Sequence, residues 1–127
     1  MLIDKVMDHL REKTALILFL SLFLPLSAHA DDTEIVMFGS KSCVYCRVFD
    51  REVAPNYHWS QAARRAPLKA INFDMEGTGG YALRGGAITV TPTFVMFKRG
   101  REVARIRGYP GKKNFYRMVD EILTKVR

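Results

Sequence analysis

Cys43 and Cys46 are the only cysteines of the chain, and two residues stand between them. In the first turn of a helix this spacing places both sulfur atoms on one side, near enough to close a disulfide. Cys43 would lie where unpaired backbone N–H groups and the positive end of the helix dipole stabilise a thiolate. We therefore predict thiol–disulfide exchange, in which an exposed Cys43 is the nucleophile and a buried Cys46 resolves the mixed disulfide.

The residues around the cysteines are typical of a helix that begins there. Ser40 or Ser42 is expected to cap this helix, and Pro55 is expected to stop it. Lys41 and Arg47 add positive charge close to the sulfur atoms. We expect these two cations to lower the pKa of the nucleophilic thiol.

Other uses of the cysteine pair are weaker alternatives. A structural disulfide that closes so short a loop contributes only ~2 kcal/mol, against ~4.5 kcal/mol for a loop that spans most of a domain. A zinc site needs four ligands, and besides the two cysteines the chain offers only His9, His29 and His58. A zinc half-site shared between chains is the remaining alternative. We expect neither a metal nor a cofactor.

The N-terminal region has the segment order of a secretory signal peptide. Basic residues precede an apolar run over residues 15–26, and a small-x-small triplet at residues 28–30 follows it. A membrane anchor, the main alternative, needs about 20 apolar residues to cross the hydrocarbon layer. We predict a signal peptide over residues 1–30, cleavage after Ala30, and export of a mature domain (residues 31–127) to the periplasm.

The charge balance limits the partners of the mature domain. The chain has 20 Lys and Arg against 13 Asp and Glu, a formal net charge of +7, and residues 1–30 hold three of each sign. We favour a solvated basic face over an acidic protein partner or an anionic membrane surface. No basic run is interleaved with aromatic residues, so nucleic acid is not expected as a partner. A domain of this size builds one modest core, and we predict a monomer.

Strand and helix patterns follow one another along the mature domain. Residues 34–38 and 68–73 are typical of strands, and residues 93–97 and 102–106 read as a hairpin. Helical spacing predicts helices after Ser42, over residues 56–65 with Tyr57 and Trp59 packed inside, and after Gly111. Glycines over residues 77–86 indicate a loop. This order predicts an α/β fold, a mixed sheet with helices covering its faces.

Thr91-Pro92 stands directly before the strand expected at residues 93–97. An X-Pro bond costs only ~0.5–1 kcal/mol to be cis, so a folded loop can hold that isomer. A cis Pro92 would free the preceding backbone to pair with an extended substrate segment beside the sulfur atoms. A trans proline that starts a strand is the commoner alternative.

Several motifs occur together in the order and spacing of the thioredoxins. They are Phe38, Cys43-Val44-Tyr45-Cys46, Val90-Thr91-Pro92-Thr93-Phe94, Phe97-Lys98-Arg99-Gly100 and Arg107-Gly108. Over residues 33–127 the sequence therefore resembles the thioredoxin family. The resemblance implies a thioredoxin fold, the two cysteine roles given above, a cis Pro92 and a close approach of substrate at Gly108. The substrate-binding residues expected from it are Thr91, Pro92, Gly108 and Tyr45.

One position departs from this pattern. Thioredoxins carry a buried acid six residues before the first cysteine, and Met37 stands there in this chain. The sequence therefore shows no evident carboxylate that could deprotonate Cys46 during resolution.

Residues 52–57 and 107–111 resemble a narrower group, the small periplasmic thioredoxins of the sulfur-oxidation (Sox) system, the SoxS type. That likeness implies a reductant of the carrier protein SoxYZ, or of similar exported thiol proteins, supplied by a membrane thiol donor of the DsbD or CcdA kind. We predict an oxidoreductase that reduces disulfides of exported proteins. The alternatives are a disulfide isomerase or oxidase, and a non-catalytic peptide-binding module whose cysteines stay locked as a cystine.

Overall fold

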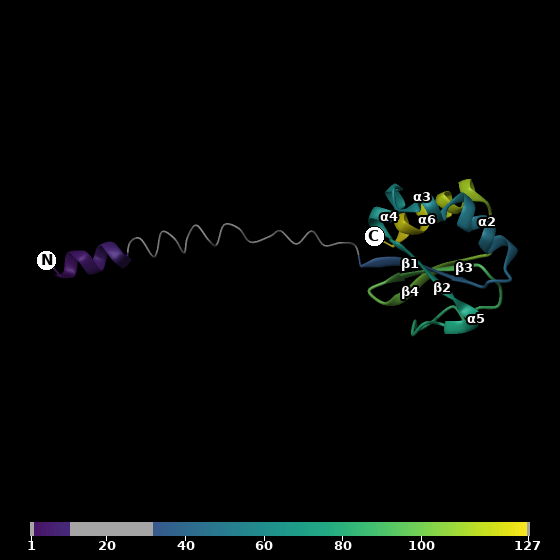
Figure 1. Cartoon of the computed structure of the whole chain (residues 1–127), viewed down its shortest axis with the longest axis horizontal. Helices are drawn as coiled ribbons and strands as arrows, with labels where there is room; N and C mark the ends of the chain where they lie inside the picture. Colours follow the sequence, from purple (N-terminus) through teal and green to yellow (C-terminus); the bar gives the residue numbers. More distant parts are fainter. Residues whose placement is uncertain (1, 11–31, 127) are drawn as a thin grey trace.

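The computed structural model describes residues 2–10 and 32–126. Within residues 32–126, strands and helices alternate first and a hairpin follows, which is the predicted order (Figure 1). The strands are β1 (Thr33–Gly39), β2 (Leu68–Asn72), β3 (Thr93–Lys98) and β4 (Arg101–Arg107). The helices are α2 (Val44–Glu52), α3 (Ala54–Tyr57), α4 (Gln61–Arg65), α5 (Phe73–Glu76) and α6 (Lys112–Lys125).

The four strands form one mixed sheet in the order β2-β1-β3-β4. β1 pairs parallel with β2 and antiparallel with β3, and β3 pairs antiparallel with β4. A parallel pair needs a long crossover, and α2, α3 and α4 supply it between β1 and β2. The predicted mixed sheet is therefore confirmed.

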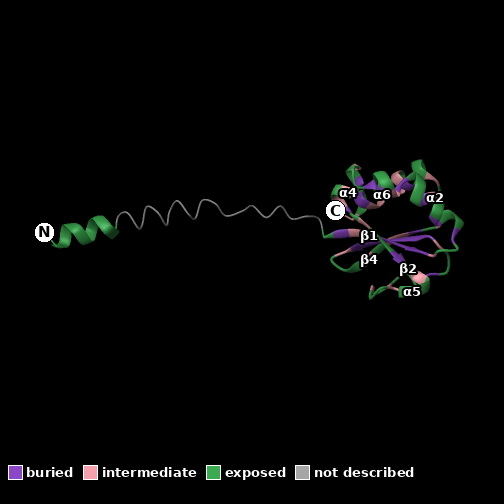
Figure 2. Cartoon of the chain, viewed as in Figure 1, coloured by how far each residue is buried: buried purple, intermediate pink, exposed green. Residues whose placement is uncertain are grey.

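Alternate residues of β1 enter two separate cores, as the two-residue period of a strand requires. Ile35 and Met37 face a core under α2, α3, α4 and α6, whereas Val36 and Phe38 face a smaller one. Within the part of the chain that the structure describes, the one-turn helix α5 and the loop after it cover this second face (Figures 1 and 2). The prediction of helices on both faces is therefore only partly right, because Tyr81, Leu83 and Ile88 of that loop bury the second face.

The stretch predicted as one helix over residues 56–65 is two short helices. The helix is interrupted at Ser60, whose hydroxyl accepts the N–H of Ala63 at 3.1 Å and so caps a new helix, α4. Pro55 lies in the first turn of α3, as its second residue, where the missing N–H costs no helix hydrogen bond. Tyr57 packs in the core as predicted, but Trp59 is 78% exposed and its predicted packing is wrong. Trp59 lies in the turn between the two short helices, which points it away from the core.

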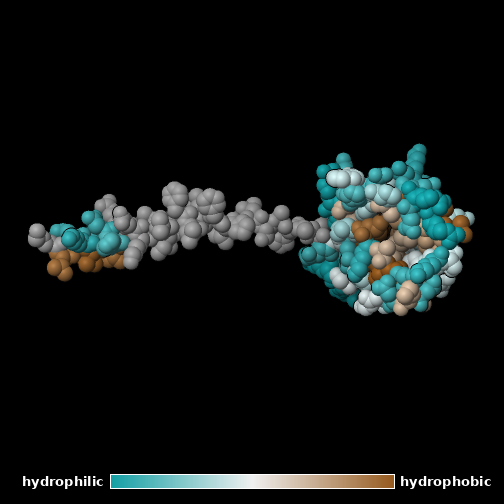
Figure 3. All heavy atoms as spheres, viewed as in Figure 1, coloured by the Kyte–Doolittle hydropathy of each residue, from teal (hydrophilic) through white to brown (hydrophobic). Residues whose placement is uncertain are grey.

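Residues 2–10 form a helix. Its exposed apolar side chains gather on one side, opposite polar ones (Figure 3); they are Leu2, Ile3, Val6, Met7 and Leu10. The apolar run at residues 15–26 and the expected cleavage site lie outside the described residues. Among the residues that the structure describes, no helix is long and apolar enough to cross a membrane.

Candidate active site

Cys43 and Cys46 form a disulfide at the N-terminus of α2, with their Cα atoms 5.2 Å apart. Cys43 itself is the N-cap of this helix, and its sulfur accepts the backbone N–H of Cys46 at 3.1 Å. The prediction of a serine cap is wrong, because the Ser40 and Ser42 hydroxyls bond to each other at 3.2 Å instead. The Cys43 sulfur thus lies where a helix N–H stabilises negative charge.

The two cysteine residues differ less in exposure than we predicted. Cys43 is 8% exposed and Cys46 is 3% exposed, so the nucleophile is not an exposed residue. Cys43 is buried because it packs in the core under α2, α3, α4 and α6, where its sulfur is also bonded to that of Cys46. The exposed side chains at this end of α2 are Val44 and Tyr45, at 59% and 63%. The expected substrate contact Tyr45 therefore lies on the open surface next to the disulfide.

An aromatic cluster holds α2 against the sheet. Phe49 lies one turn after Cys46 and is fully buried. Its ring centroid lies 4.7 Å from that of Phe94 on β3 and 5.1 Å from that of Phe115 on α6. Aromatic contacts of this kind stabilise the packing beyond what the burial of the three side chains contributes. The cysteine pair is thereby carried on a helix whose position is set by the core.

Three of the four expected substrate-binding residues meet at one end of the sheet. Phe38 at the end of β1 pairs with Thr93, which in turn pairs with Arg107 at the end of β4. The Thr91-Pro92 peptide bond is cis, and the Pro92 carbonyl accepts the N–H of Gly108 at 2.7 Å. The segments that hold Thr91, Pro92 and Gly108 therefore lie at the same end of the sheet as the turn that leads from β1 to Cys43.

Gly108 has the backbone conformation that disfavours other residues. Its φ is +77°, and a Cβ atom added there would meet no atom within 4 Å. The space above Gly108 is therefore open, as a close approach of another chain requires.

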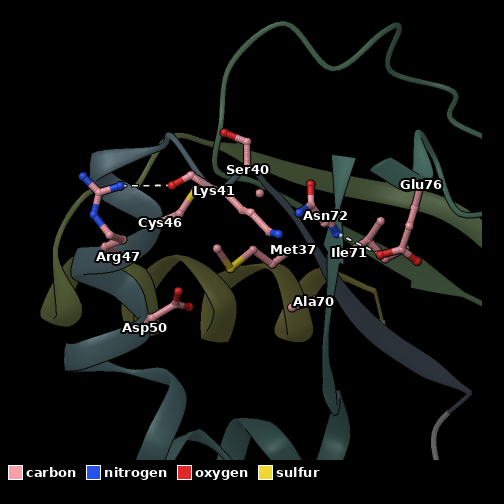
Figure 4. Close-up of a pocket in the computed structure, with 11 residues that line it drawn as sticks. Met37, Ser40, Lys41, Cys46, Arg47, Asp50, Ala70, Ile71, Asn72 and Glu76 are labelled. Carbon is pink, nitrogen blue, oxygen red and sulfur yellow. Dashed lines mark hydrogen bonds between the residues drawn. The ribbon is translucent and has the colours of Figure 1, made fainter. Parts of the chain in front are cut away.

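Lys41 and Arg47 lie beside Cys46, on either side of the cysteine pair in the sequence. The Arg47 guanidinium donates to the Lys41 carbonyl at 3.1 Å, which holds the turn before α2. Both residues line a pocket of about 390 Å³ together with Cys46 (Figure 4). Gly39 permits this arrangement, because a Cβ atom there would lie 3.3 Å from the Cys46 sulfur.

Asp50 also lines this pocket, on the same helix as Cys46, and the sequence reasoning missed it. The spacing of Cys46 and Asp50 could have indicated it, because residues four apart on a helix lie on one face. A contact between Tyr109 and Glu52 was likewise not predicted from the sequence: the Tyr109 hydroxyl donates to a Glu52 oxygen at 2.6 Å. Burial and this hydrogen bond raise the pKa of Tyr109.

A buried ion pair fixes the loop that leads toward Thr91. Glu102 and Arg105 on β4 are joined at 2.6 Å, and their side chains are only 5% and 7% exposed. Glu102 also accepts the backbone N–H groups of Arg84 and Gly85, at 2.6 and 3.0 Å. Burial opposes the charge of Glu102, but the Arg105 and backbone hydrogen bonds outweigh burial and lower its pKa to about 2.

Within residues 2–10 and 32–126, no group of three or more His, Cys, Asp and Glu side chains is placed to hold a metal ion.

A family model of the thioredoxin-like domain matches residues 27–123, which is most of the chain. The chain belongs to the thioredoxin-like family. Among solved structures, this thioredoxin-like protein is similar to the periplasmic thioredoxin SoxS from Paracoccus pantotrophus, with 28% identity and a TM-score of 0.64. That match covers 75% of this chain and 99% of SoxS.

More distant thioredoxins share the fold alone. The thioredoxin of Malassezia sympodialis is 17% identical with a TM-score of 0.54, covering 74% of this chain and 80% of its own. The thioredoxin of Fasciola hepatica is 22% identical with a TM-score of 0.52, covering 72% and 81%. None of the curated proteins is similar enough in sequence to match. The predicted thioredoxin fold and the likeness to SoxS are confirmed.

Proposed function

We propose that this thioredoxin-like protein is a thiol–disulfide oxidoreductase that reduces disulfides of exported proteins in the periplasm. One observation carries the proposal: the Cys43 sulfur caps α2 and accepts the Cys46 N–H, while it is bonded to the Cys46 sulfur. A plain structural disulfide has no need of a sulfur atom placed where a thiolate is stabilised.

The reduced protein would act in two exchange steps. The Cys43 thiolate attacks one sulfur of a substrate disulfide, which forms a mixed disulfide and releases the other substrate sulfur as a thiolate. Cys46 then attacks the Cys43 sulfur, breaks the mixed disulfide and releases the second substrate thiol. The substrate gains two electrons, and the protein is left with the Cys43–Cys46 disulfide seen in this structure.

The backbone next to Pro92 offers a place for the substrate chain. Within the described residues, the backbone N–H and C=O of Thr91 make no hydrogen bond, while the neighbouring Pro92 carbonyl is held by Gly108. An extended substrate segment could pair with Thr91, pass over the open space at Gly108 and contact the exposed Tyr45. Lys41 and Arg47 would add positive charge that favours the thiolate form of Cys43.

The sequence pattern of residues 1–30 supports export, with a signal peptide removed after Ala30 and residues 31–127 as the mature domain. The similarity to a periplasmic thioredoxin supports the same compartment. On this basis we propose a SoxYZ-like carrier as one candidate substrate, and a membrane thiol donor of the DsbD or CcdA kind as the source of electrons. The mature protein would act as a monomer.

Trapping tests the proposal directly. Cys46→Ala removes the resolving thiol, so a substrate should remain bound to Cys43 through a disulfide when the variant is expressed in the periplasm. The matched control is the double variant Cys43→Ala, Cys46→Ala, which should trap nothing. A trapped carrier protein of sulfur oxidation supports the narrower assignment, whereas trapping of unrelated secreted proteins alone contradicts it.

A turnover assay separates the oxidoreductase from a peptide-binding module. The wild-type protein should accelerate the reduction of insulin by dithiothreitol, and Cys43→Ser should abolish the acceleration. Equal insulin reduction with and without Cys43 would overturn the proposed activity.

A further inference from the structure

The pocket beside Cys46 is large enough to hold water molecules. Its volume is about 390 Å³, and a polar pocket needs only about 10–15 Å³ of such space to hold one water molecule. Three parts of the chain form its walls: the end of β1, the first turns of α2, and the segment from β2 into α5. Cys46 is 3% exposed and lines this pocket, and a Cβ atom on Gly39, another lining residue, would lie 3.3 Å from its sulfur, so the pocket offers water a route to that sulfur.

The side chain that β1 contributes to the pocket beside Cys46 cannot accept a proton. Met37 is 4% exposed and lines the pocket beside Cys46. Its thioether is at most a weak hydrogen-bond acceptor and has no proton to exchange. The proton of the Cys46 thiol therefore needs an acceptor elsewhere.

Asp50 offers that acceptor. It lies four residues after Cys46 on α2, so the two side chains share one face of the helix. Figure 4 shows the Asp50 carboxylate on the side of α2 that faces the pocket, which Met37 also lines. Within the part of the chain that the structure describes, no hydrogen bond or ion pair holds this carboxylate.

The other charged groups that line the pocket are Lys41, Arg47 and Glu76. The Glu76 carboxylate is engaged, because its Oε1 accepts the backbone N–H of Asn72 at 3.2 Å. The Arg47 guanidinium is turned to the Lys41 carbonyl. Among the described residues, Asp50 is thus the pocket carboxylate without a hydrogen bond or an ion pair.

We propose that Asp50, acting through pocket water, accepts the proton that Cys46 loses when it resolves the mixed disulfide. This inference rests on the proposed oxidoreductase function. The Cys46 proton passes through water to the Asp50 carboxylate while the Cys46 sulfur bonds to the Cys43 sulfur. The bond between Cys43 and the substrate breaks, and the substrate sulfur leaves as a thiolate that is protonated from solvent.

Stopped-flow reaction of the reduced protein with dithiobis(nitrobenzoate) separates the attack by Cys46 from the earlier attack by Cys43. Attack by Cys43 releases one coloured nitrothiobenzoate, and resolution by Cys46 releases a second. Because nitrothiobenzoate leaves as a stable thiolate, the second phase reports deprotonation and attack by Cys46. The proteins compared are the wild type, Asp50→Asn and the control Asp74→Asn. The control makes the same charge change at an exposed residue of α5 that does not line the pocket.

In acidic buffer, Asp50→Asn should slow the second phase about 10-fold and leave the first phase unchanged. The rate of its second phase should then follow the thiolate fraction of Cys46 as pH rises, more steeply than in the wild type. Asp74→Asn should match the wild type in both phases. A second phase in Asp50→Asn that is as fast as in Asp74→Asn, at every pH, overturns the proposal. The absence of a first phase in the wild type would instead overturn the proposed function, and this inference with it.

Discussion

The Tyr109 hydroxyl donates a 2.6 Å hydrogen bond to the Glu52 carboxylate, although the two residues are 57 positions apart. This bond ties the loop after β4 to the last residue of α2. The adjacent residue, Gly108, donates its N–H to the Pro92 carbonyl. One run of contacts therefore sets the spacing between the cysteine helix and the backbone beside Pro92.

Tyr109→Phe should loosen this spacing without emptying the core, because the ring that packs on Phe49 at 5.5 Å is kept. We expect a loss of about 1 kcal/mol in the free energy of unfolding, measured in urea. Insulin reduction should slow, while the first-phase reaction with dithiobis(nitrobenzoate) stays unchanged because that small disulfide needs no extended backbone. Tyr45→Phe, at an exposed residue, is the control for stability and should leave the free energy of unfolding unchanged.

Gly108→Ala tests whether a substrate chain approaches this residue closely. The variant keeps the backbone N–H, and its Cβ atom meets nothing in the chain, so its stability cost comes from the positive φ and is about 1–2 kcal/mol. If a substrate segment passes over this position, kcat/KM for insulin should fall about 10-fold, the effect of losing roughly 1.4 kcal/mol of binding.

Gly100→Ala is a matched control for that experiment. Gly100 has a φ of +72° and equally open space, but it lies in the turn between β3 and β4. It should have the same stability cost and keep full activity. Equal insulin reduction by the two variants would show that Gly108 is not a substrate contact.

Glu102 should make the domain sensitive to acid. Its pKa is lowered from 4.5 to about 2, so its contribution to stability is complete above pH 4.5 and is lost as pH falls toward 2. The loss should amount to about 3 kcal/mol. Urea unfolding at a series of acidic pH values should show this slope in the wild type but not in Glu102→Gln. Glu121→Gln removes an exposed pair with Arg117 and should change stability by less than about 1 kcal/mol.

Tyr57 should make the domain sensitive to alkali. Its hydroxyl donates to the Ala66 carbonyl at 2.7 Å, and burial, followed by the nearby Tyr116 and Asp120, raises its pKa above 10.0. A raised pKa means that this contribution to stability is complete below pH 10.0 and is lost as pH rises beyond it. The free energy of unfolding should therefore fall above that pH in the wild type and fall less in Tyr57→Phe.

The Tyr57→Phe variant itself should lose about 1–3 kcal/mol at neutral pH, because the buried Ala66 carbonyl loses its donor. Absorbance of tyrosinate gives an independent check. An alkaline titration in which Tyr57 ionises near pH 10.0, before the domain unfolds, would contradict this prediction.

Features that depend on neighbouring residues were predicted well from the sequence. The spacing of Cys43 and Cys46 places both sulfur atoms in one helical turn wherever the rest of the chain lies, and the alternation in β1 divides its side chains between two faces. The order of strands and helices then restricts the topology to a mixed sheet. The motif around Thr91-Pro92 and Gly108 located the segments that meet at the end of the sheet.

Features that depend on residues far apart in the chain were decided by the tertiary structure. Neither Tyr109 nor Glu52 has a local pattern that indicates the other, and the pocket at Asp50 exists only because β1, β2 and α5 close around it. The exposure of Trp59 and the burial of Cys43 likewise follow from which surface the neighbouring elements cover. Residue type and spacing determine which chemistry is available, whereas burial, partners and access to water are properties of the packed chain.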